Sequence, residues 1–556
     1  MIKKEKFLLL LIFCLCFYLL YILLFVQKSE KRLCNKNYKC PDCNVILISV
    51  DALRADRLGC YGYERNTSPN IDKIANEGIL FENHISQAPW TVPSHSSMFT
   101  SLYPYPYGLK NPIMLDESFT TLAEVLKENN YTTVAFTEGN FMSAEFGFNQ
   151  GFDIFNESGG GLVKVNGMIS EWLNRSSRRP FFLFIHTYDT HCLSMDKPPE
   201  PYRSMYDKDF EENITYCGHE QDLTTKSERE LFHQNAVYDG AVNYVDKLLG
   251  DLFEEFKEHN IYDKSIIIIT SDHGDEIGDH GLFDHGHSLY NELIHVPLII
   301  KYTNSKEACN RRFESISRAV DIMPTILDFL NISFKDKMEG RSLSPKILDP
   351  KFNPQQSAIS IGYFNPPHKN KNLIAIRDEG VIISFSEIRE INLIYEGMGG
   401  YGQEFTCGDK KYFMEVLSQK NIVNETMKKI EFTLNSVNCF NTSDEVTRSK
   451  NKIFSVDNIS FLYDPHFKII YDHLYSIREN NWKLIISKNN PPELYNIKND
   501  PKEKENLIEK EKNIAERLTK KLHEFIRSKK IEDETENLII SEETLKKLKE
   551  LGYIIE

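Results

Sequence analysis

At 556 residues, the chain is longer than one hydrophobic core usually supports, so we expect a large domain accompanied by a smaller one. Its 41% hydrophobic and 26% charged residues are typical of a globular protein. The formal net charge of −15 argues against a nucleic-acid partner, because phosphate groups would be repelled over most of the surface. A small anionic substrate is compatible with this charge, since it meets only the local field of its site.

An unbroken apolar run of 20 residues, 7–26, stands near the start of the sequence. As a helix it is long enough to cross a bilayer, and the three lysines before it favour a cytoplasmic N-terminus. A cleaved signal peptide is the alternative, and either segment would place the rest of the chain outside the cytoplasm. We therefore expect a signal-anchored, single-pass membrane protein with a cytoplasmic tail at 1–6 and a stalk at 27–43.

Residues 44–350 alternate short apolar strands with amphipathic helices. Strands are predicted at 44–50, 131–136, 181–186, 265–270 and 296–302, and helices at 69–78, 93–99, 119–129, 230–259 and 318–330. This alternation predicts a doubly wound α/β sheet. Polar residues directly follow three of the strands, namely Asp51, Asp189 with His191, and Asp272 with His273. Ligands bind at the carboxyl ends of strands in such sheets, so we expect these clusters to form one site.

A smaller C-terminal α+β subdomain is expected over 351–530, followed by a helical tail at 531–556. Its predicted elements are strands at 372–385 and 454–475, a hairpin of 482–486 and 493–497, and a helix at 503–527. Near the stalk, Cys34, Cys40 and Cys43 lack a fourth ligand at the spacing of a zinc knuckle. A disulfide, or a cysteine that links two copies of the chain, is therefore favoured over a zinc site.

Asp51, Asp272 and His273 are the candidate metal ligands. A carboxylate at the end of a buried strand is costly unless it is paired or binds a metal, although Asp51 could instead cap a turn. A carboxylate beside an imidazole suits a divalent ion such as zinc, manganese, magnesium or calcium. The glycine-rich loop after His273 has the backbone freedom that a ligand loop needs. Its other polar residues are expected to hydrogen-bond within the loop or to support the ligands; they are Asp275, Glu276, Asp279 and His280.

Thr91 is the candidate nucleophile. It lies two residues before Pro93, near the start of the helix predicted at 93–99. A helix N-terminus favours an anion, and a bound cation would lower the pKa of the hydroxyl group and hold the substrate oxyanion beside it. The alternative is that Thr91 only caps the helix.

Four histidines complete the candidate site. His191 and His287 are expected to bind the substrate oxyanion or to protonate a leaving group, and His95 is a further catalytic candidate. His285 is favoured less. Asp189, His191 and His287 could alternatively hold a second metal ion.

Three stretches carry a resemblance to a known family: VDALRADRLGCYGY at 50–63, APWTVPSHSSMFTSLYP at 88–104 and TSDHGDEIGDHGLFDHGH at 270–287. Two more lie near the C-terminus, WKLI at 482–485 and ELYNIKNDPKEKENL at 493–507. The chain resembles the sulfatase branch of the alkaline-phosphatase superfamily, over roughly 45–343 and again at these C-terminal motifs. The resemblance implies an alkaline-phosphatase/sulfatase-like α/β fold and an ester-cleaving site.

The chain departs from the family pattern at its nucleophile. Family sulfatases carry Cys or Ser followed by x-Pro-x-Arg, and the first of these residues becomes formylglycine. Here Thr91 and His95 occupy those two positions, and threonine cannot become formylglycine by that route. The usual pair of adjacent aspartates is reduced to Asp51-Ala52.

With these departures, the expected ligands of one divalent ion are Asp51, Thr91, Asp272 and His273. This set is similar to that of the threonine-nucleophile members, which transfer phosphoglycerol or phosphoethanolamine groups or cleave phosphodiesters. By the same resemblance, His191 and His287 match positions that contact the substrate oxyanion.

We therefore expect a membrane-anchored, metal-dependent hydrolase or transferase of phosphate or sulfate esters, acting through a covalent intermediate on Thr91. Phosphoesters are favoured, because a threonine sulfate lacks the aldehyde exit that formylglycine provides. A lipid headgroup or a cell-surface glycan would suit the anchor. The alternatives are a sulfatase without formylglycine and a catalytically silent protein that binds anionic glycans or lipids.

Overall fold

The computed structural model describes residues 39–104, 114–175, 180–191, 198–209, 227–303, 310–348, 357–364, 374–378, 381–387, 401–407, 410–417, 472–487 and 491–528. The predicted membrane segment at 7–26 and the predicted tail at 531–556 lie outside these residues, as do Cys34 and most of the stalk. Within them, no helix is both long enough and apolar enough to cross a membrane.

The chain divides into two compact units. The first contains residues 1–362 and 473–532, and the second contains 363–472 and 533–556. The C-terminal hairpin and helix thus belong to the same unit as the N-terminal sheet. The domain boundaries expected from the sequence stay predictions.

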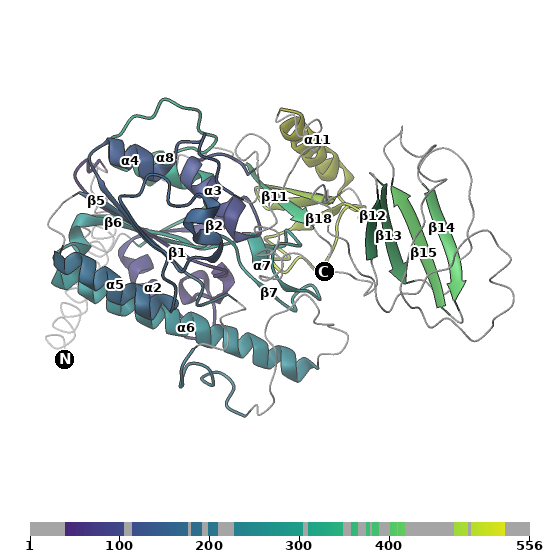
Figure 1. Cartoon of the computed structure of the whole chain (residues 1–556), viewed down its shortest axis with the longest axis horizontal. Coiled ribbons are helices and arrows are strands. Elements are labelled where there is room, and N and C mark those ends of the chain that lie inside the picture. Colours follow the sequence, from purple (N-terminus) through teal and green to yellow (C-terminus); the bar gives the residue numbers. More distant parts are fainter. Residues whose placement is uncertain are drawn as a thin grey trace, which may run out of the picture. The chain divides into compact units, whose positions relative to one another are not determined.

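An eight-stranded sheet forms the centre of the first unit, with the order β10-β2-β9-β6-β1-β5-β3-β4 (Figure 1). The strands are β1 (Asn44–Val50), β2 (Ile79–Ile85), β3 (Thr132–Phe136), β4 (Ile154–Asn156), β5 (Phe181–Thr187), β6 (Ser265–Thr270), β9 (Leu298–Lys301) and β10 (Arg311–Arg318). Strand β9 runs antiparallel to both β2 and β6, and the other pairs are parallel. The α/β class is confirmed, with a mixed rather than wholly parallel sheet.

The five predicted strands are all present, but β2, β4 and β10 were not predicted. Strands β1, β5 and β6 are buried along their whole length, which explains their continuous apolar sequences. Strand β2 contains Glu82 and Asn83, which interrupt its apolar pattern. The helix expected at 318–330 is partly wrong: Arg318 ends β10, and a short 3-10 turn, Ala319–Asp321, precedes helix α8 (Ile322–Phe329).

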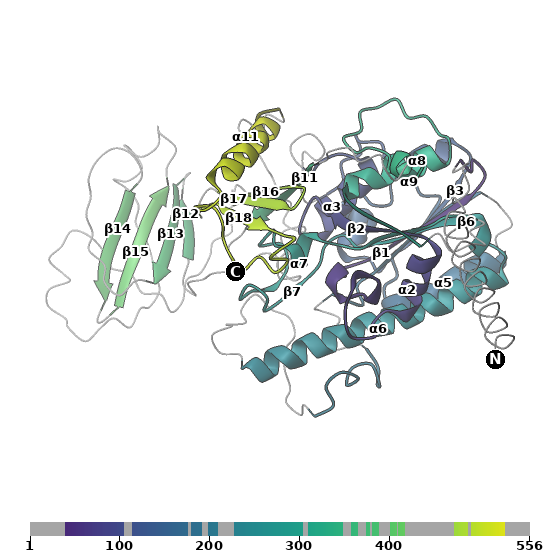
Figure 2. The same cartoon turned by 180° about the vertical axis from the view of Figure 1, so that it is seen from behind.

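Helices cover both faces of the sheet (Figures 1 and 2). One face carries α2 (Pro69–Glu77), α5 (Gly161–Arg175) and α6 (Glu228–Glu258), and the other carries α3 (Thr91–Thr100), α4 (Leu122–Glu128) and α8. The larger core lies between the sheet and α6. Its members include Ile46, Ile48, Val50, Ile267, Ile269, Val237, Val242, Val245 and Leu249.

The C-terminal part of the first unit is a four-stranded sheet followed by a helix. The sheet has the order β11-β16-β17-β18, with strands β11 (Ser357–Phe364), β16 (Asp472–Glu479), β17 (Trp482–Ser487) and β18 (Glu493–Asn496). The predicted hairpin of β17 and β18 is confirmed by their antiparallel pairing. Helix α11 (Lys512–Ser528) begins nine residues later than the helix predicted from residue 503.

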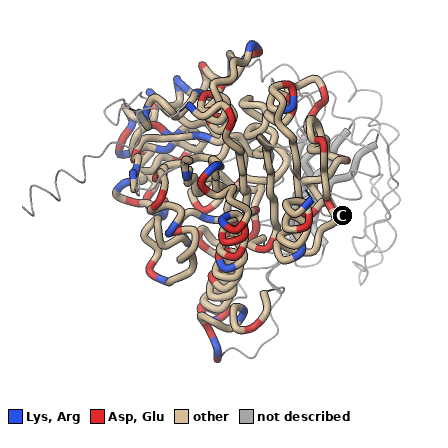
Figure 3. Tube along the Cα trace, turned by 90° about the vertical axis from the view of Figure 1, so that its left-hand side faces the viewer, with Lys and Arg blue, Asp and Glu red and all other residues tan. Residues whose placement is uncertain are grey.

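In the second unit the structure describes one antiparallel sheet, with the order β12-β13-β15-β14. Its strands are β12 (Ile374–Asp378), β13 (Val381–Glu387), β14 (Tyr401–Cys407) and β15 (Lys410–Leu417). Among the residues that are coloured in Figure 3, Lys and Arg are interspersed with Asp and Glu.

A disulfide joins Cys40 to Cys43 just before β1. Of the alternatives for these cysteines, the structure therefore selects a disulfide over a zinc knuckle. The backbone N–H of Cys40 also donates to the carbonyl of Phe329 at the end of α8 (2.7 Å), which ties the entrance of β1 to the helical layer.

The buried sheet predicts a contrast between two isoleucines. Ile269 in β6 is fully buried, whereas Ile154 in β4 is 41% exposed. We expect Ile269→Ala to lower the free energy of unfolding by about 2–5 kcal/mol, because it removes apolar contacts and leaves a cavity. Ile154→Ala should cost less than about 1 kcal/mol. Urea denaturation followed by circular dichroism measures both, and equal losses would contradict this description of the core.

Candidate active site

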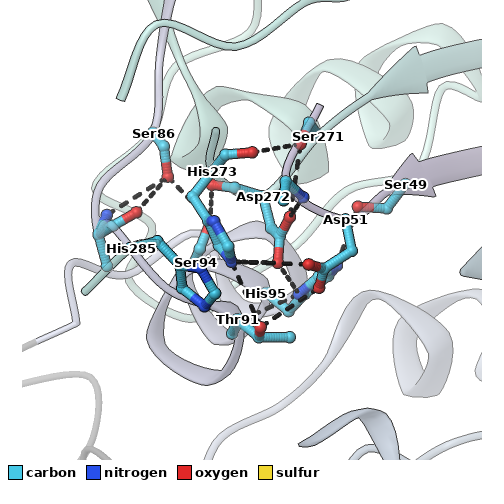
Figure 4. Close-up of polar contacts among 12 residues, drawn as sticks. Ser49, Asp51, Ser86, Thr91, Ser94, His95, Ser271, Asp272, His273 and His285 are labelled. Carbon is cyan, nitrogen blue, oxygen red and sulfur yellow. Dashed lines mark hydrogen bonds and ion pairs between the residues drawn. The ribbon is translucent and has the colours of Figure 1, made fainter. Parts of the chain in front are cut away.

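Three neighbouring strands place the predicted residues together. Strands β5, β1 and β6 are adjacent and parallel, so their carboxyl ends meet at one edge of the sheet. Asp51 follows β1, and Asp272 and His273 follow β6. Helix α3 brings Thr91 to the same edge, and in Figure 4 the side chains of these four residues point toward one another.

We call Asp51, Thr91, Asp272 and His273 the ligand cluster. Thr91 Oγ1 lies 3.3 Å from Asp51 Oδ2, to which it can donate, and 3.4 Å from His273 Nε2. His273 Nε2 lies 3.4 Å from Asp272 Oδ2 and 3.9 Å from Asp51 Oδ1. All four side chains are completely buried. For bonds of about 2.0–2.2 Å to one ion, tetrahedral ligand atoms lie about 3.3–3.6 Å apart, so this spacing fits a single metal.

The two carboxylates carry the strongest indication of a cation. Asp51 Oδ1 and Asp272 Oδ2 are buried and have no hydrogen-bond partner among the described residues. Burial, together with the nearby Asp272 carboxylate, raises the pKa of Asp51 well above its ordinary value. For Asp272, burial is outweighed by His273, His95 and His186, which lower its pKa. A divalent ion would compensate both charges, and Asp51, Asp272 and His273 are grouped closely enough to share one.

His273 is oriented as a metal ligand. Its Nδ1 lies 2.8 Å from the carbonyl oxygen of Gly274, which selects the tautomer with the proton on Nδ1. The lone pair of Nε2 then faces the ligand cluster. Burial lowers the pKa of His273 despite the neighbouring Asp272 carboxylate, so the imidazole is neutral and can coordinate.

Thr91 is the first residue of α3 rather than its cap. The N-cap position belongs to Trp90, which makes no side-chain capping bond. The Thr91 hydroxyl contacts Asp51 and His273 instead. This geometry does not support the interpretation of Thr91 as a simple helix cap, and its role as nucleophile stays a prediction.

His95 lies inside the protein behind Thr91. Its Nδ1 is 3.0 Å from the Thr91 carbonyl oxygen and 3.4 Å from Asp272 Oδ2, and its Nε2 is 2.9 Å from Ser49 Oγ. Burial lowers its pKa to about 4. Both ring nitrogens thus contact groups of the protein itself, a geometry that suits support of Thr91 and Asp272.

His186 is the main feature that the sequence analysis missed. It lies in β5 beside Ser49 of β1, is fully buried, and its Nε2 is 3.3 Å from Asp51 Oδ2. Burial lowers its pKa to about 4, and its Nδ1 has no hydrogen-bond partner among the described residues. The sequence feature that could have identified His186 is a histidine near the carboxyl end of an otherwise apolar strand.

The remaining histidines make different contacts near the loop that follows β6 and contains His273 and Gly274, which we call the metal loop. The ring of His285 stacks on that of His273, with the ring centroids 4.2 Å apart. The ring of His191 contacts that of His285 edge-on, with the ring centroids 4.7 Å apart. His191 is almost completely buried, and burial lowers its pKa well below the ordinary value. His287 instead places Nε2 2.5 Å from Glu276 Oε2 and Nδ1 3.1 Å from the carbonyl oxygen of His285. Although burial acts the other way, Glu276 raises the pKa of His287.

The alternative second-metal set is not assembled. Asp189 Oδ2 accepts from the N–H of Leu162 (2.6 Å) at the start of α5 and from Thr187 Oγ1 (3.0 Å), while His287 is held by Glu276. His191 is grouped with Asp284 and His285.

The loop residues after His273 hydrogen-bond within the protein, as expected. Asp275 pairs with His285, and Asp279 forms an ion pair of 2.6 Å with Arg54. His280 Nδ1 bonds Glu292, its Nε2 lies 3.2 Å from the carbonyl oxygen of Glu503, and its ring stacks on Tyr290. Both ring nitrogens of His280 face acceptors, an arrangement that suits a doubly protonated imidazole.

A family profile described as Sulfatase matches residues 43–332, and one described as N-sulphoglucosamine sulphohydrolase, C-terminal, matches 278–396. The chain is 27% identical over 406 residues to the multifunctional alkaline phosphatase superfamily protein PehA of Trinickia caryophylli, covering 55% of this chain and 77% of the relative. It is 25% identical over 378 residues to an arylsulfatase of Clostridium perfringens, covering 55% and 78%.

Solved structures show the same fold. The phosphonate monoester hydrolase of Agrobacterium radiobacter superposes with a TM-score of 0.57 at 18% identity, covering 88% of this chain and 96% of that one. A putative sulfatase from Bacteroides thetaiotaomicron gives a TM-score of 0.58 at 15% identity, covering 90% and 96%.

The carboxylate oxygens that lack a hydrogen bond, Asp51 Oδ1 and Asp272 Oδ2, predict opposite effects of Asp51→Asn with and without metal. In metal-free protein the raised pKa of Asp51 means that its ionised form destabilises the fold at neutral pH, so the variant should unfold at a higher urea concentration than wild type. Added Zn²⁺ should stabilise wild type strongly and the variant little. Asp251→Asn, at an exposed position on α6, is the matched control. A variant stabilised by Zn²⁺ as much as wild type would contradict the assigned site.

His280 predicts a pH dependence of stability. Burial acts against its charge, but the bond to Glu292 raises its pKa to about 9 from an ordinary 6.5. Its stabilising contribution is therefore complete below pH 6.5 and is lost as pH rises through about 9. The difference in unfolding free energy between wild type and His280→Gln should shrink over that range. His523→Gln, at an exposed position on α11, is the control for the substitution itself.

Proposed function

Because this chain belongs to the sulfatase family and is an ester hydrolase of that family, we propose that it cleaves or transfers its ester through Thr91 with the help of one divalent ion. The observation that carries the proposal is the contact of Thr91 Oγ1 with both Asp51 and His273, beside two carboxylate oxygens without hydrogen-bond partners. A hydroxyl group in that environment is suited to attack, because its proton has an acceptor and its oxygen lies among metal ligands.

The ligand cluster would hold zinc, manganese, magnesium or calcium. Such an ion would supply Lewis-acid chemistry, by stabilising negative charge on the ester and on the Thr91 oxygen. The protein's own contribution is to direct the nucleophile. The Thr91 hydroxyl donates toward Asp51 Oδ2, and the first turn of α3, buttressed by His95, holds its oxygen in place.

The proposed reaction has two steps. Thr91 Oγ1 loses its proton toward Asp51 Oδ2 and bonds to the central atom of the ester, while the bond to the leaving oxygen breaks and that oxygen takes up a proton to depart as an alcohol. Water, or a second alcohol in a transferase, then loses a proton as it bonds to the same centre, and Thr91 Oγ1 regains a proton as its own bond to that centre breaks. We assign contact with the substrate oxyanion to His191, which lies beside His285 near the ligand cluster. His95 and His287 receive supporting roles, since their ring nitrogens bond within the protein.

Phosphoesters and phosphonate esters are the preferred substrates in this proposal. A threonine phosphate can be discharged to water or alcohol, whereas a threonine sulfate lacks the aldehyde exit of formylglycine. The names of two similar proteins, an alkaline phosphatase superfamily member and a phosphonate monoester hydrolase, support this preference. A sulfate ester is the second candidate, since other relatives are an arylsulfatase and an N-acetylglucosamine-6-O-sulfatase.

We also propose that segment 7–26 anchors the chain, with its N-terminus cytoplasmic and the catalytic unit outside the cytoplasm. The Cys40–Cys43 disulfide supports this location, because disulfides persist in oxidising compartments. A substrate on a lipid headgroup or a cell-surface glycan would suit such an anchor.

Thr91→Ala tests the proposal. With nitrophenyl esters of phosphate, methylphosphonate and sulfate, and each of the four metals in turn, we expect the variant to lose at least about 10³-fold in turnover on the preferred ester. Thr91→Ser keeps the hydroxyl group and should retain measurable turnover. Undiminished activity of Thr91→Ala would exclude the threonine mechanism. A wild-type preference for sulfate would favour the sulfatase alternative, and metal binding without turnover of any ester would favour a binding protein.

A further inference from the structure

Two C-terminal sequence motifs meet in one buried ion pair that the proposed reaction does not use. Lys483, in the WKLI motif of β17, places Nζ 2.7 Å from Oε1 of Glu503, in the ELYNIKNDPKEKENL motif. Both side chains are completely buried. The two motifs lie at a distance in sequence from every residue of the ligand cluster, so their role has to be found in the structure.

Stability alone is a poor explanation of this pair. Removing two charges from water costs about as much as their attraction returns, so a buried ion pair stabilises a fold weakly. Glu503 also adopts a left-handed backbone conformation (φ 50°), which is unfavourable for a residue other than glycine. The surrounding structure therefore holds Glu503 in an unfavourable conformation, with its carboxylate buried.

The pair binds helix α7 (Asn291–Ile294). Glu503 Oε2 accepts from the backbone N–H of Asn291 (2.7 Å), and Lys483 Nζ donates to Asn291 Oδ1 (3.3 Å). The amide of Asn291 also donates to the carbonyl of Pro501 (3.3 Å). Asn291 thus uses its backbone N–H and both ends of its side chain to contact the C-terminal segment.

Helix α7 in turn packs on the metal loop. The backbone N–H of Gly274, the residue after His273, donates to the carbonyl of Leu293 (2.8 Å). The approach is so close that a Cβ atom at Gly274 would lie 1.9 Å from the carbonyl oxygen of Glu292. The carbonyl of Gly274 is the group that orients the His273 ring through Nδ1. A continuous series of contacts therefore runs from Lys483 and Glu503 to a predicted metal ligand.

We propose that Lys483 and Glu503 are positioning residues that hold α7 against Gly274 and so orient His273 before an ion binds. The inference rests on the proposed function in one respect, namely that His273 is a metal ligand. The order of α7 and of the Gly274 backbone follows from the same contacts whether or not an ion is bound.

The test compares Glu503→Gln with a matched control in the full-length chain. Glu503→Gln keeps the shape and one acceptor but removes the charge opposite Lys483. The control, Glu479→Gln, removes a slightly less buried charge that pairs with Arg517 and Lys521 of α11 instead of with α7. Two quantities are measured: the Zn²⁺ dissociation constant by calorimetry, and hydrogen exchange of the metal-free segment containing Gly274.

We expect Glu503→Gln to weaken Zn²⁺ binding by about 10-fold or more, as loss of a residue that orients a ligand typically does, and to speed exchange at Gly274. Glu479→Gln should change neither. Normal binding and normal exchange in Glu503→Gln would overturn the inference. If wild type itself binds no Zn²⁺, manganese, magnesium or calcium, the proposed function fails, and the exchange rates still decide whether the pair orders the loop.

A double variant covers the case in which Glu503→Gln does not fold. Lys483→Met combined with Glu503→Leu removes both charges of the pair at once, so neither member is left buried opposite an uncharged side chain, and the double variant should fold more readily than a variant that removes one charge alone. It nevertheless lacks the groups that bind Asn291, and we expect the same weakened Zn²⁺ binding and faster exchange. A folded double variant with wild-type values for both would also overturn the inference.

Discussion

The central constraint on this fold is the burial of two carboxylates, Asp51 and Asp272, beside the His273 imidazole. Each is fully buried and has an oxygen atom without a hydrogen-bond partner among the described residues. Ionised groups in such a place are unfavourable unless a cation joins them. The fold accepts this cost at the edge where β1 and β6 end, and the Thr91 hydroxyl group is brought to the same point.

Several elements of the fold hold the two carboxylates and their neighbours in place. Adjacent parallel strands bring the carboxylates together, and α3 adds the hydroxyl group from the other side. His95 of α3 contacts Asp272 and His186 of β5 contacts Asp51, and burial keeps both rings neutral. The metal loop is supported from outside by α7 and by the C-terminal segment. Its conformation therefore depends on residues more than two hundred positions away in the sequence.

Local patterns predicted much of this arrangement, and long-range packing explains what they missed. Asp51, Asp272 and His273 could be placed at one edge because apolar strands end directly before them. Strand β2 escaped prediction because Glu82 and Asn83 interrupt its apolar pattern. His186 was overlooked because only the pairing of β5 with β1 reveals that it faces Asp51. Glu503 was expected in a helix, yet its partners Lys483 and Asn291 hold it in a left-handed turn that no local pattern indicates.

The disulfide before β1 has a geometric consequence for access to the site. Cys40 and Cys43 lie at the amino end of β1, whereas Asp51 follows its carboxyl end, seven residues of extended chain away, or roughly 23 Å. The polypeptide thus enters this unit at the amino ends of the central strands, at the edge of the sheet opposite to Thr91. With the anchor that we propose at 7–26, the ligand cluster would therefore lie at the edge of the sheet opposite to the point where the chain is attached.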